Sequence, residues 1–264
     1  ISKFLNIGID SLVFIDDNPT EREEVRKACP QVFVPEVSED PSAFLQALKF
    51  SDPFCIDSIL TNEDLLRNKN FYSKNEESNL IESADSYEDF LKELKIMVEI
   101  TNINKGNFER TLQLNNKTNQ FNFTGKRLTP DDLNTIVNDK KQFNITYSAS
   151  DKFSEYGLIG IVFFNLKNDC IYITNWVMSC RVFKKTIEHL IFNEIKKIAL
   201  KNKIEKIKIM YNPNSKNRIL LDFLHENKFE QVEGSQESQY NSGFWQLSNV
   251  KNSNIVTYAK LKKL

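Results

Sequence analysis

The segment that decides the fold of most of this chain reads YGLIGIVFFNLKNDCIYITNWV and covers residues 156–177. Two apolar runs, 156–164 and 170–177, flank the turn-forming pair Asn168-Asp169. This pattern predicts an antiparallel β-hairpin. An amphipathic helix is expected directly after it, over residues 182–201, because apolar side chains recur there at helical spacing.

Shorter elements are expected on both sides of this segment. Ser86 and Thr129 stand where helix caps belong, and Pro130 suits the first position of a helix. The further expected elements are helices over 87–94, 107–115 and 215–226 and from Pro130 onward, strands over 96–100, 144–149 and 204–211, and two terminal strands. Together they predict an α+β domain over residues 86–264.

The first fifty residues follow a different pattern. The apolar run Ser11–Ile15 ends abruptly in Asp16-Asp17-Asn18-Pro19, as a buried parallel strand does at its carboxyl end. The expected continuation is a helix over 20–26, a short strand over 32–34 and a helix over 41–49. This order predicts the last portion of a parallel α/β sheet over residues 1–50, with a polar connector over 51–85.

Composition excludes several function classes. The 35 Lys and Arg residues against 36 Asp and Glu residues give a net charge of −1, and so no general attraction to nucleic acid or to an anionic membrane surface. No apolar stretch is long enough to span a membrane and no signal peptide opens the chain, so we expect a cytoplasmic protein. The 7 glycines allow neither a dinucleotide-binding fingerprint nor a P-loop, and the 4 cysteines have no zinc-type spacing.

Asp16 and Asp17 form the strongest local chemical signal. Ligands of open parallel sheets bind beyond the carboxyl ends of the strands. Two adjacent carboxylates there repel each other unless a cation intervenes, and Mg²⁺ held by carboxylate and substrate phosphate oxygens would satisfy them. On residue types alone, a helix-capping Asp beside a solvated Asp is favoured about two to one over a metal site.

The motif Phe14-Ile15-Asp16-Asp17-Asn18-Pro19, followed by Glu21–Arg26 and Val32–Glu36, resembles the closing acidic motif of haloacid-dehalogenase-type (HAD) phosphotransferases, in particular of the FkbH-like branch. The similarity continues in order through Leu60–Asp64, Arg67, Tyr72, Leu112–Asn122, Asp151–Phe153, Gly157 and Trp176–Val182. The resemblance implies the carboxyl-terminal part of a HAD-like domain, followed by an acyltransferase-like domain of the GNAT type. It also implies that the chain is truncated at its amino terminus.

The FkbH-like resemblance also implies an activity. Members of this family are implicated in taking a glyceryl group from a small phosphorylated donor and placing it on the phosphopantetheine thiol of an acyl carrier protein, in secondary metabolite biosynthesis. Asp16 would then be a Mg²⁺ ligand, with Asp17 as an auxiliary ligand. The nucleophile motif of the family, Asp-x-Asp-x-Thr, does not occur in these 264 residues, so the chain alone is not expected to transfer phosphoryl groups.

In the second domain the resemblance points to the passage from Trp176 through Arg181 into the long helix, where a GNAT fold binds pantetheine pyrophosphate at a helix N-terminus. Lys184 and Thr186 stand where the family has glycines, which puts coenzyme A binding in doubt. The lysines at 184, 185, 196 and 197 are candidates to attract a phosphopantetheine arm or an acidic carrier. A solvated helix face is favoured for them about three to one.

Cys180 is the candidate nucleophile. A thiol just before a helix and beside Arg181 is expected to have a depressed pKa, as a thioester-forming group needs. A structural cysteine at a buried strand end is favoured about three to one, because no partner base is identifiable.

A polar run supplies the remaining binding candidates. Lys117, Asn119, Gln120 and Asn122 can fix a polar ligand by hydrogen bonds, and Lys117 can neutralise a phosphate. An ordinary polar loop is about equally favoured on residue types. Two further candidates, Asp151 and Arg181, are alternatively a structural ion pair.

The leading hypothesis is therefore an FkbH-like enzyme that loads an acyl or glyceryl group onto a carrier protein. One alternative is a GNAT-like module that docks the carrier without catalysis, which the missing glycines favour. The other is a HAD-class phosphatase that has no carrier partner.

Overall fold

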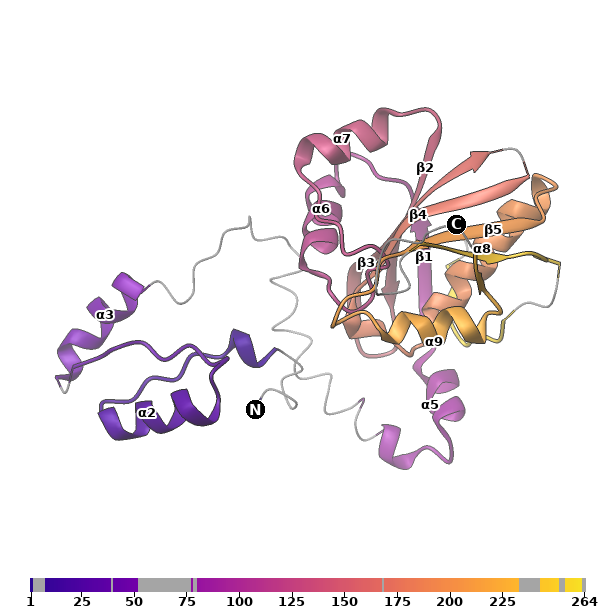
Figure 1. The fold of residues 1–264 in the computed structure, drawn as a ribbon. Coiled ribbons are helices and arrows are strands. Elements are labelled where there is room, and N and C mark those ends of the chain that lie inside the picture. Colours follow the sequence, from indigo (N-terminus) through magenta and orange to yellow (C-terminus); the bar gives the residue numbers. More distant parts are fainter. Residues whose placement is uncertain are drawn as a thin grey trace. The chain divides into compact units, whose positions relative to one another are not determined.

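The computed structural model describes residues 1, 8–38, 40–51, 77, 80–167, 169–232, 243–251 and 255–262. The chain divides into a first unit, Ile1–Ile59, and a second unit, Leu60–Leu264 (Figure 1). The predicted connector over 51–85 falls mostly on residues 52–76, which lie outside the described residues, so the predicted three-part division stays a prediction.

The first unit contains η1 (Ile9–Ser11), α2 (Pro19–Ala28), η2 (Pro41–Ala43) and α3 (Phe44–Ser51). Where the sequence predicts two parallel strands, the structure has a single parallel bridge between Val13 and Phe33. The pairing direction is as predicted, but no extended ladder forms. Among the described residues of this unit, the buried ones are Arg22, Pro35 and Val37.

The second unit is built on one mixed sheet of eight strands in the order β6-β7-β5-β4-β3-β2-β1-β8. Its strands are β1 (Met97–Thr101), β2 (Gln142–Ser150), β3 (Glu155–Lys167), β4 (Cys170–Met178), β5 (Lys206–Tyr211), β6 (Glu230–Gln231), β7 (Gly243–Leu247) and β8 (Lys260–Leu261). Strands β1 to β4 form an antiparallel meander that contains the predicted hairpin, and β5 lies parallel to β4. The mixed α+β architecture expected for this part of the chain is confirmed.

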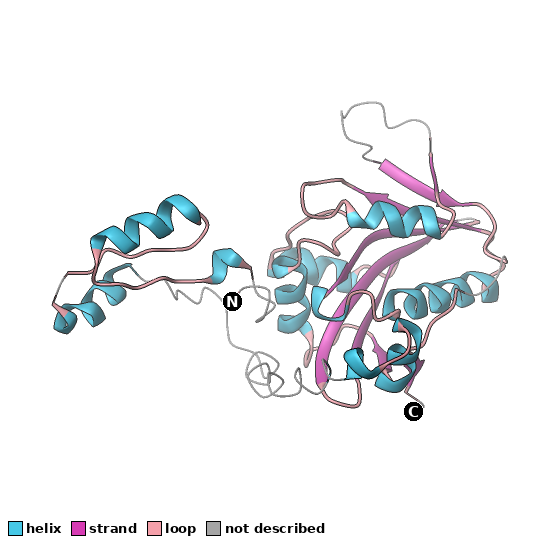
Figure 2. Ribbon diagram, turned by 90° about the horizontal axis from the view of Figure 1, so that it is seen from below, coloured by secondary structure: helices cyan, strands magenta, loops and turns pink. Residues whose placement is uncertain are grey.

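Helices cover both faces of this sheet (Figure 2). The larger core lies between the sheet and α5 (Tyr87–Leu94), α8 (Ile187–Lys201) and α9 (Ile219–Glu226). A smaller core lies between the other face and α6 (Phe108–Lys117) and α7 (Pro130–Asn138). Residues of β3 alternate between the two cores, as the period of a strand requires: Ile159 belongs to the larger core and Leu158 to the smaller one.

The predicted caps are present. The Ser86 hydroxyl accepts a hydrogen bond from the Asp89 N–H, and Thr129 forms a capping box with Asp132 at the start of α7.

A close approach in the sheet depends on a glycine. Gly160 lies opposite Tyr147 across β2 and β3, and a Cβ atom on it would stand 1.9 Å from Tyr147 Cζ. The missing side chain therefore makes room for the fully buried Tyr147 ring, whose hydroxyl accepts a hydrogen bond from Trp176 Nε1 at 2.9 Å.

The long helix begins later than the sequence predicts. Residues Cys180–Val182 form the 3-10 turn η3, and α8 begins at Ile187 instead of residue 182. Lys184 and Thr186 have positive φ angles of 69° and 58°, and such left-handed residues interrupt a right-handed helix. The apolar periodicity is continuous through this region, which is why it does not reveal the break.

Strand β4 leaves β5 halfway along its length. The two strands pair from Cys170 to Ile173, and the register of β4 against β3 then shifts at Thr174. Such a bulge bends a strand and increases its twist. Residues 175–178 of β4 therefore continue beside β3 with their other edge turned away from β5.

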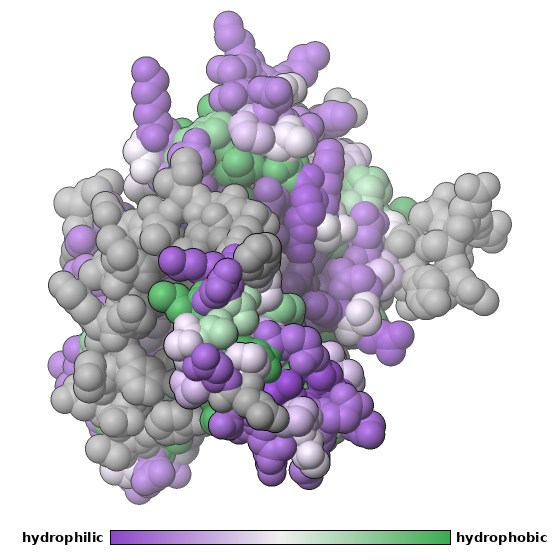
Figure 3. All heavy atoms as spheres, turned by 90° about the vertical axis from the view of Figure 1, so that its left-hand side faces the viewer, coloured by the Kyte–Doolittle hydropathy of each residue, from purple (hydrophilic) through white to green (hydrophobic). Residues whose placement is uncertain are grey.

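Among the coloured residues on the face drawn in Figure 3, hydrophilic side chains surround smaller apolar patches. Within the described ranges, every helix is too short or too polar to span a lipid bilayer.

Candidate functional site

Asp16 and Asp17 lie between the Val13 bridge and α2, as expected for the end of a strand. Asp16 Oδ1 accepts a hydrogen bond from the Asn18 N–H at 2.8 Å. Arg22 donates to the backbone carbonyls of both aspartates at 2.9 Å. Asp16 thus supports the turn into α2, but the cap of that helix is Asn18, whose side chain accepts from the Thr20 N–H at 2.9 Å.

These two carboxylates do not complete a metal site by themselves. Among the described residues, no group of three or more His, Cys, Asp or Glu side chains is arranged to hold a metal ion. Magnesium needs about six oxygen ligands in a near-octahedral arrangement. The Mg²⁺ assignment of Asp16 and Asp17 therefore stays a prediction that requires further ligands.

The predicted polar binding segment divides into an exposed and a buried part. Lys117, Asn119 and Gln120 are exposed, and Asn119 accepts a hydrogen bond from Arg127. Asn122 is fully buried, donates to the Thr118 carbonyl at 3.2 Å and accepts from the Gly125 N–H at 2.9 Å. Its amide therefore holds the chain in place and does not face solvent.

The segment Phe121–Phe123 fills the gap where β4 and β5 separate. Phe123 N–H donates to the Trp176 carbonyl at 3.1 Å, and Phe121 accepts from the Met178 N–H at 2.9 Å. On the other side, the Phe123 carbonyl accepts from the Asn212 N–H at 2.8 Å, just after β5. A strand edge left open in this way is a place where an extended ligand can add hydrogen bonds. In this protein the chain itself makes them.

A network of buried asparagines fixes this inserted segment. Asn217 donates to the Asn122 carbonyl at 2.9 Å, and Asn175 accepts from the Thr124 N–H at 3.2 Å. Asn115 donates to the Lys126 carbonyl at 2.9 Å. Buried polar networks of this kind stabilise one arrangement, because each broken bond leaves a buried group without a partner. The segment is therefore a permanent part of the fold.

The N-terminus of α8 holds a carboxylate of its own. Glu188 lies in the first turn and is 5% exposed. Its Oε2 atom has no hydrogen-bond partner among the described residues. Burial raises the pKa of Glu188 to about 7, while hydrogen bonds from the backbone N–H groups of Glu188 and Lys184 oppose this. The positive end of the helix dipole thus faces this carboxylate, where an external anion would otherwise bind.

Neighbouring groups also cover the loop before α8. Tyr87 of α5 donates to the Lys184 carbonyl at 3.2 Å. From the C-terminal segment, Tyr258 N–H donates to Thr186 Oγ1 at 3.0 Å, and Thr257 Oγ1 donates to the Thr186 carbonyl at 2.8 Å.

A buried charged cluster stands behind this loop. Lys185, 7% exposed, places its ammonium 2.7 Å from the Tyr156 hydroxyl, 3.3 Å from Asp151 Oδ2 and 2.6 Å from Glu77 Oε1. The Tyr156 hydroxyl donates to Asp151 Oδ2 at 2.5 Å. Burial, together with that hydrogen bond, holds the pKa of Tyr156 above its usual range. Asp151 is thus ion-paired with Lys185, a residue that the sequence pattern placed on a solvated helix face.

The predicted solvated helix face is wrong for two of its four lysines. Lys185 and Lys196 are buried, whereas Lys184 and Lys197 are exposed. Charge alone does not separate them. Lys196 and Lys197 are consecutive residues of α8 and therefore lie on different sides of that helix, whereas Lys184 and Lys185 lie in the loop before it.

Cys180 does not lie at the start of an α-helix. It belongs to η3, seven residues before α8 begins, so the predicted helix-dipole effect on its thiol is wrong. The alternative of a buried structural cysteine is also wrong, because Cys180 is exposed. The neighbouring Arg181 donates to Ser179 Oγ and to the Tyr156 carbonyl, each at 3.3 Å. The structure therefore presents an accessible thiol beside an anchored guanidinium.

The comparisons with known proteins found solved structures that resemble this chain, and nothing else. No protein-family model and no curated protein matches the sequence. The PaiA N-acetyltransferase of Thermoplasma acidophilum, solved with coenzyme A, matches at 11% identity over 57% of this chain and 98% of that chain, with a TM-score of 0.42. A spermidine N-acetyltransferase from Vibrio cholerae, solved with CoA and spermine, matches at 14% identity, 57% and 93% coverage, and a TM-score of 0.42.

An acetyltransferase of the GNAT family from Staphylococcus aureus matches at 14% identity over 58% of this chain and 99% of that chain, with a TM-score of 0.43. At these identities and scores the likeness says nothing about ligands or activity. What this chain can bind follows from its own contacts.

Proposed function

We propose that the chain belongs to an FkbH-like acyl-loading protein and that its second unit is a GNAT-like module for docking a carrier protein. In this proposal the second unit does not use coenzyme A as an acyl donor. The observation that carries it is the buried Glu188 carboxylate at the N-terminus of α8. A pyrophosphate placed there would meet a like charge, or would bind only while that carboxyl is protonated.

The inserted segment Phe121–Phe123 supports the same conclusion. It takes the backbone hydrogen bonds of Trp176 and Met178 that an extended pantetheine chain would need. The neighbouring residues Lys117, Asn119 and Gln120 are exposed and polar, so we assign them to contacts with the carrier or its phosphopantetheine arm.

The exposed thiol of Cys180 favours a second candidate, a covalent acyl intermediate. Its sulfur would form a bond to the acyl carbon while the donor's leaving group departs with the thiol proton. The carrier thiol would then attack the same carbon and return a proton to Cys180. Arg181, anchored on Ser179 and Tyr156, would orient an anionic donor.

For the first unit we propose that Asp16, assisted by Asp17, contributes to a Mg²⁺ site for a small phosphorylated substrate in the complete protein. Mg²⁺ would supply charge neutralisation for the phosphate. Phosphate release from small phosphoesters by the native gene product, without any acylated carrier, would instead support a HAD-class phosphatase.

The docking proposal is tested by titrating the full chain, in separate calorimetric experiments, with a phosphopantetheinylated acyl carrier protein and with coenzyme A. We expect heat from carrier binding and none from coenzyme A. Coenzyme A binding, or absence of carrier binding, contradicts the proposal.

Substitution of Cys180 by Ala separates the two candidates in a carrier-loading assay with the native gene product. Cys29→Ala is the matched control, because Cys29 is a free, half-buried thiol of the first unit. Loading retained by both variants excludes the covalent intermediate. Loss of loading in Cys180→Ala alone supports it.

A further inference from the structure

Two loops of the second unit carry an excess of positive charge. The first, residues 115–128, runs from the last turn of α6 to just before α7, and the second, residues 211–218, runs from the end of β5 to the start of α9. Together they contain five cationic side chains and no Asp or Glu. All five are exposed, and we call them the cationic patch: Lys117, Lys126, Arg127, Lys216 and Arg218.

The two loops lie against each other where β4 and β5 separate. The Phe123 carbonyl of the first loop accepts from the Asn212 N–H of the second at 2.8 Å. The Asn217 amide of the second loop donates to the Asn122 carbonyl of the first at 2.9 Å. The loops therefore form one surface around the inserted segment Phe121–Phe123.

Hydrogen bonds to backbone atoms hold this surface in one shape. The Lys126 carbonyl accepts from the Asn115 amide at 2.9 Å, and the Lys216 N–H donates to Asn214 Oδ1 at 2.8 Å. The guanidinium of Arg127 donates to two backbone carbonyls of its own loop, each at 2.9 Å. A surface that is ordered before binding loses less conformational entropy when a partner arrives.

Little negative charge of the chain itself stands against the patch. None of its five cations takes part in an ion pair among the described residues of this unit. The next acidic residues along the chain are Asp131, Asp132 and Asp222, in the first turns of α7 and α9. A carboxylate there complements the positive end of its own helix dipole. The patch therefore favours a partner that brings several negative charges.

The patch lacks the side chains with which proteins hold nucleic acids or enter membranes. The aromatic rings of both loops, Phe121, Phe123 and Tyr211, are at most 1% exposed, so none is available to stack on a base. Leu128 is also buried, so neither loop offers a large apolar side chain to a lipid surface. Acidic side chains of a protein need neither feature, because they pair with lysine and arginine directly.

We propose that the cationic patch is the surface on which the carrier protein docks, through acidic side chains of the carrier. This inference rests on the proposed docking function and adds the place where the carrier binds. Each exposed ion pair is weak and is screened by salt. The affinity therefore depends on several such pairs together and falls as the ionic strength rises.

The experiment is a fluorescence-anisotropy titration of a labelled, phosphopantetheinylated acyl carrier protein with the full chain, at about 50 mM and about 300 mM sodium chloride. We expect Lys216→Glu to weaken binding about fivefold, and the double variant Lys216→Glu/Arg218→Glu at least about tenfold. Lys216→Arg keeps the charge and should bind like the wild type. The higher salt concentration should weaken wild-type binding more than that of the double variant. Both glutamates stand just before α9, where the helix dipole favours them, so the fold is not weakened.

Lys105→Glu is the matched control, because Lys105 is exposed in an equivalent turn before α6. In that turn the Asn104 N–H donates to Asn107 Oδ1 and the Asn107 N–H donates to Asn104 Oδ1. Asn214 and Asn217 exchange the same two hydrogen bonds before α9. The control lies at the N-terminal end of α6, whereas the patch begins at its C-terminal end. We expect Lys105→Glu to leave carrier binding unchanged.

The outcomes separate this inference from the docking function. Equal carrier binding by the wild type, the double variant and Lys105→Glu overturns the patch and leaves docking in place. An equal loss in Lys105→Glu and Lys216→Glu also overturns it, because the effect is then one of total charge. Tighter binding of oligothymidylate than of the carrier assigns the patch to nucleic acid instead. If the carrier does not bind the wild type, the docking function fails and this inference fails with it.

Discussion

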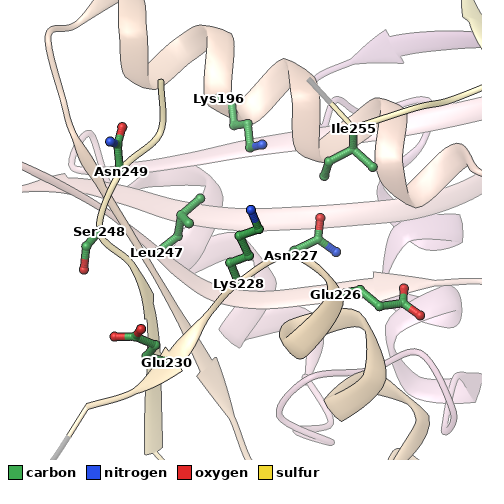
Figure 4. A pocket seen from close by; sticks show the side chains of 9 residues that line it. All are labelled: Lys196, Glu226, Asn227, Lys228, Glu230, Leu247, Ser248, Asn249 and Ile255. Carbon is green, nitrogen blue, oxygen red and sulfur yellow. The ribbon is translucent and has the colours of Figure 1, made fainter. Parts of the chain in front are cut away.

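Two regions beside α8 differ in how far the chain's own side chains fill them. Before α8, the buried Lys185 is held by Asp151, Tyr156 and Glu77, and the helix N-terminus faces Glu188. At the pocket of about 220 Å³ that Lys196 and Asn227 line (Figure 4), Lys196 is also buried, and Asn227 Oδ1 has no hydrogen-bond partner among the described residues. The first region is filled by the chain's own ion pairs, whereas the second is an open cavity. A cationic segment in a sequence therefore does not show which of its lysines the fold buries.

The largest loss of stability is expected from Lys185→Met, which tests whether the region before α8 is held together by its buried ion pairs. It leaves Asp151, whose side chain is fully buried, without its cation. Removing one partner of a buried pair costs about 3–5 kcal/mol of the free energy of unfolding. Urea denaturation measures it, with the exposed neighbour in Lys184→Met as the control. A similar loss in both variants would show that the cluster is not closed in the way described. The double variant with Asp151→Asn should recover part of the loss.

The second test is the pH dependence of stability in the variant Glu188→Gln. The pKa of Glu188 in the folded protein, about 7, lies above the ordinary glutamate value of 4.5, so folding favours the protonated form. The stability contributed by this group is fully present below about pH 4.5 and is lost as the pH rises through 7. Glutamine mimics the protonated form. We expect the variant to match the wild type near pH 4.5 and to be more stable at pH 8, by up to about 3 kcal/mol.

Thermal and urea unfolding of Glu188→Gln at pH 4.5, 6 and 8 would measure this difference. Glu194→Gln is the control, since Glu194 lies on the same helix and forms an ion pair with Lys197. A difference that does not grow with pH would contradict the burial of the Glu188 carboxylate.

Asn122→Ala tests whether the inserted segment is permanent. The substitution removes the bonds to the Thr118 carbonyl and from the Gly125 N–H. The Thr118 carbonyl still accepts from Arg127, whereas the half-buried Gly125 N–H loses its acceptor. A loss of about 2 kcal/mol is expected from such a deletion. Gln120→Ala, at an exposed position two residues before, should change the urea midpoint little. If Asn122→Ala were as stable as Gln120→Ala, the segment would be free to leave the gap between β4 and β5.

The smallest structural effect is expected from thiol labelling. Cys180 is exposed, Cys29 is half-buried and Cys170 is buried. A maleimide reagent should therefore modify Cys180 before Cys29, and Cys170 only after denaturation, as peptide mass spectrometry would show. Rapid labelling of Cys170 in the folded protein would contradict the placement of β4 in the sheet.

The sequence by itself determined most of the second unit. Apolar alternation and turn residues identify the hairpin of β3 and β4, and the caps Ser86 and Thr129 mark the starts of α5 and α7. These signals are local. The alternation of side chains along a strand and the capping of a helix both involve residues that are close together in the chain. The parallel direction of Val13 and Phe33 was predictable from the order strand, helix, strand, because a helix that crosses over returns the chain in the same direction.

Tertiary structure alone decided what the polar residues do. The left-handed conformations of Lys184 and Thr186 move the start of α8, and only the folded chain shows that Asn122 fills a gap between strands. The pocket at Lys196 joins residues separated by some thirty to sixty positions, among them Asn227 and Ile255. Burial and partnership of a charge depend on such distant contacts, and no local pattern contains them.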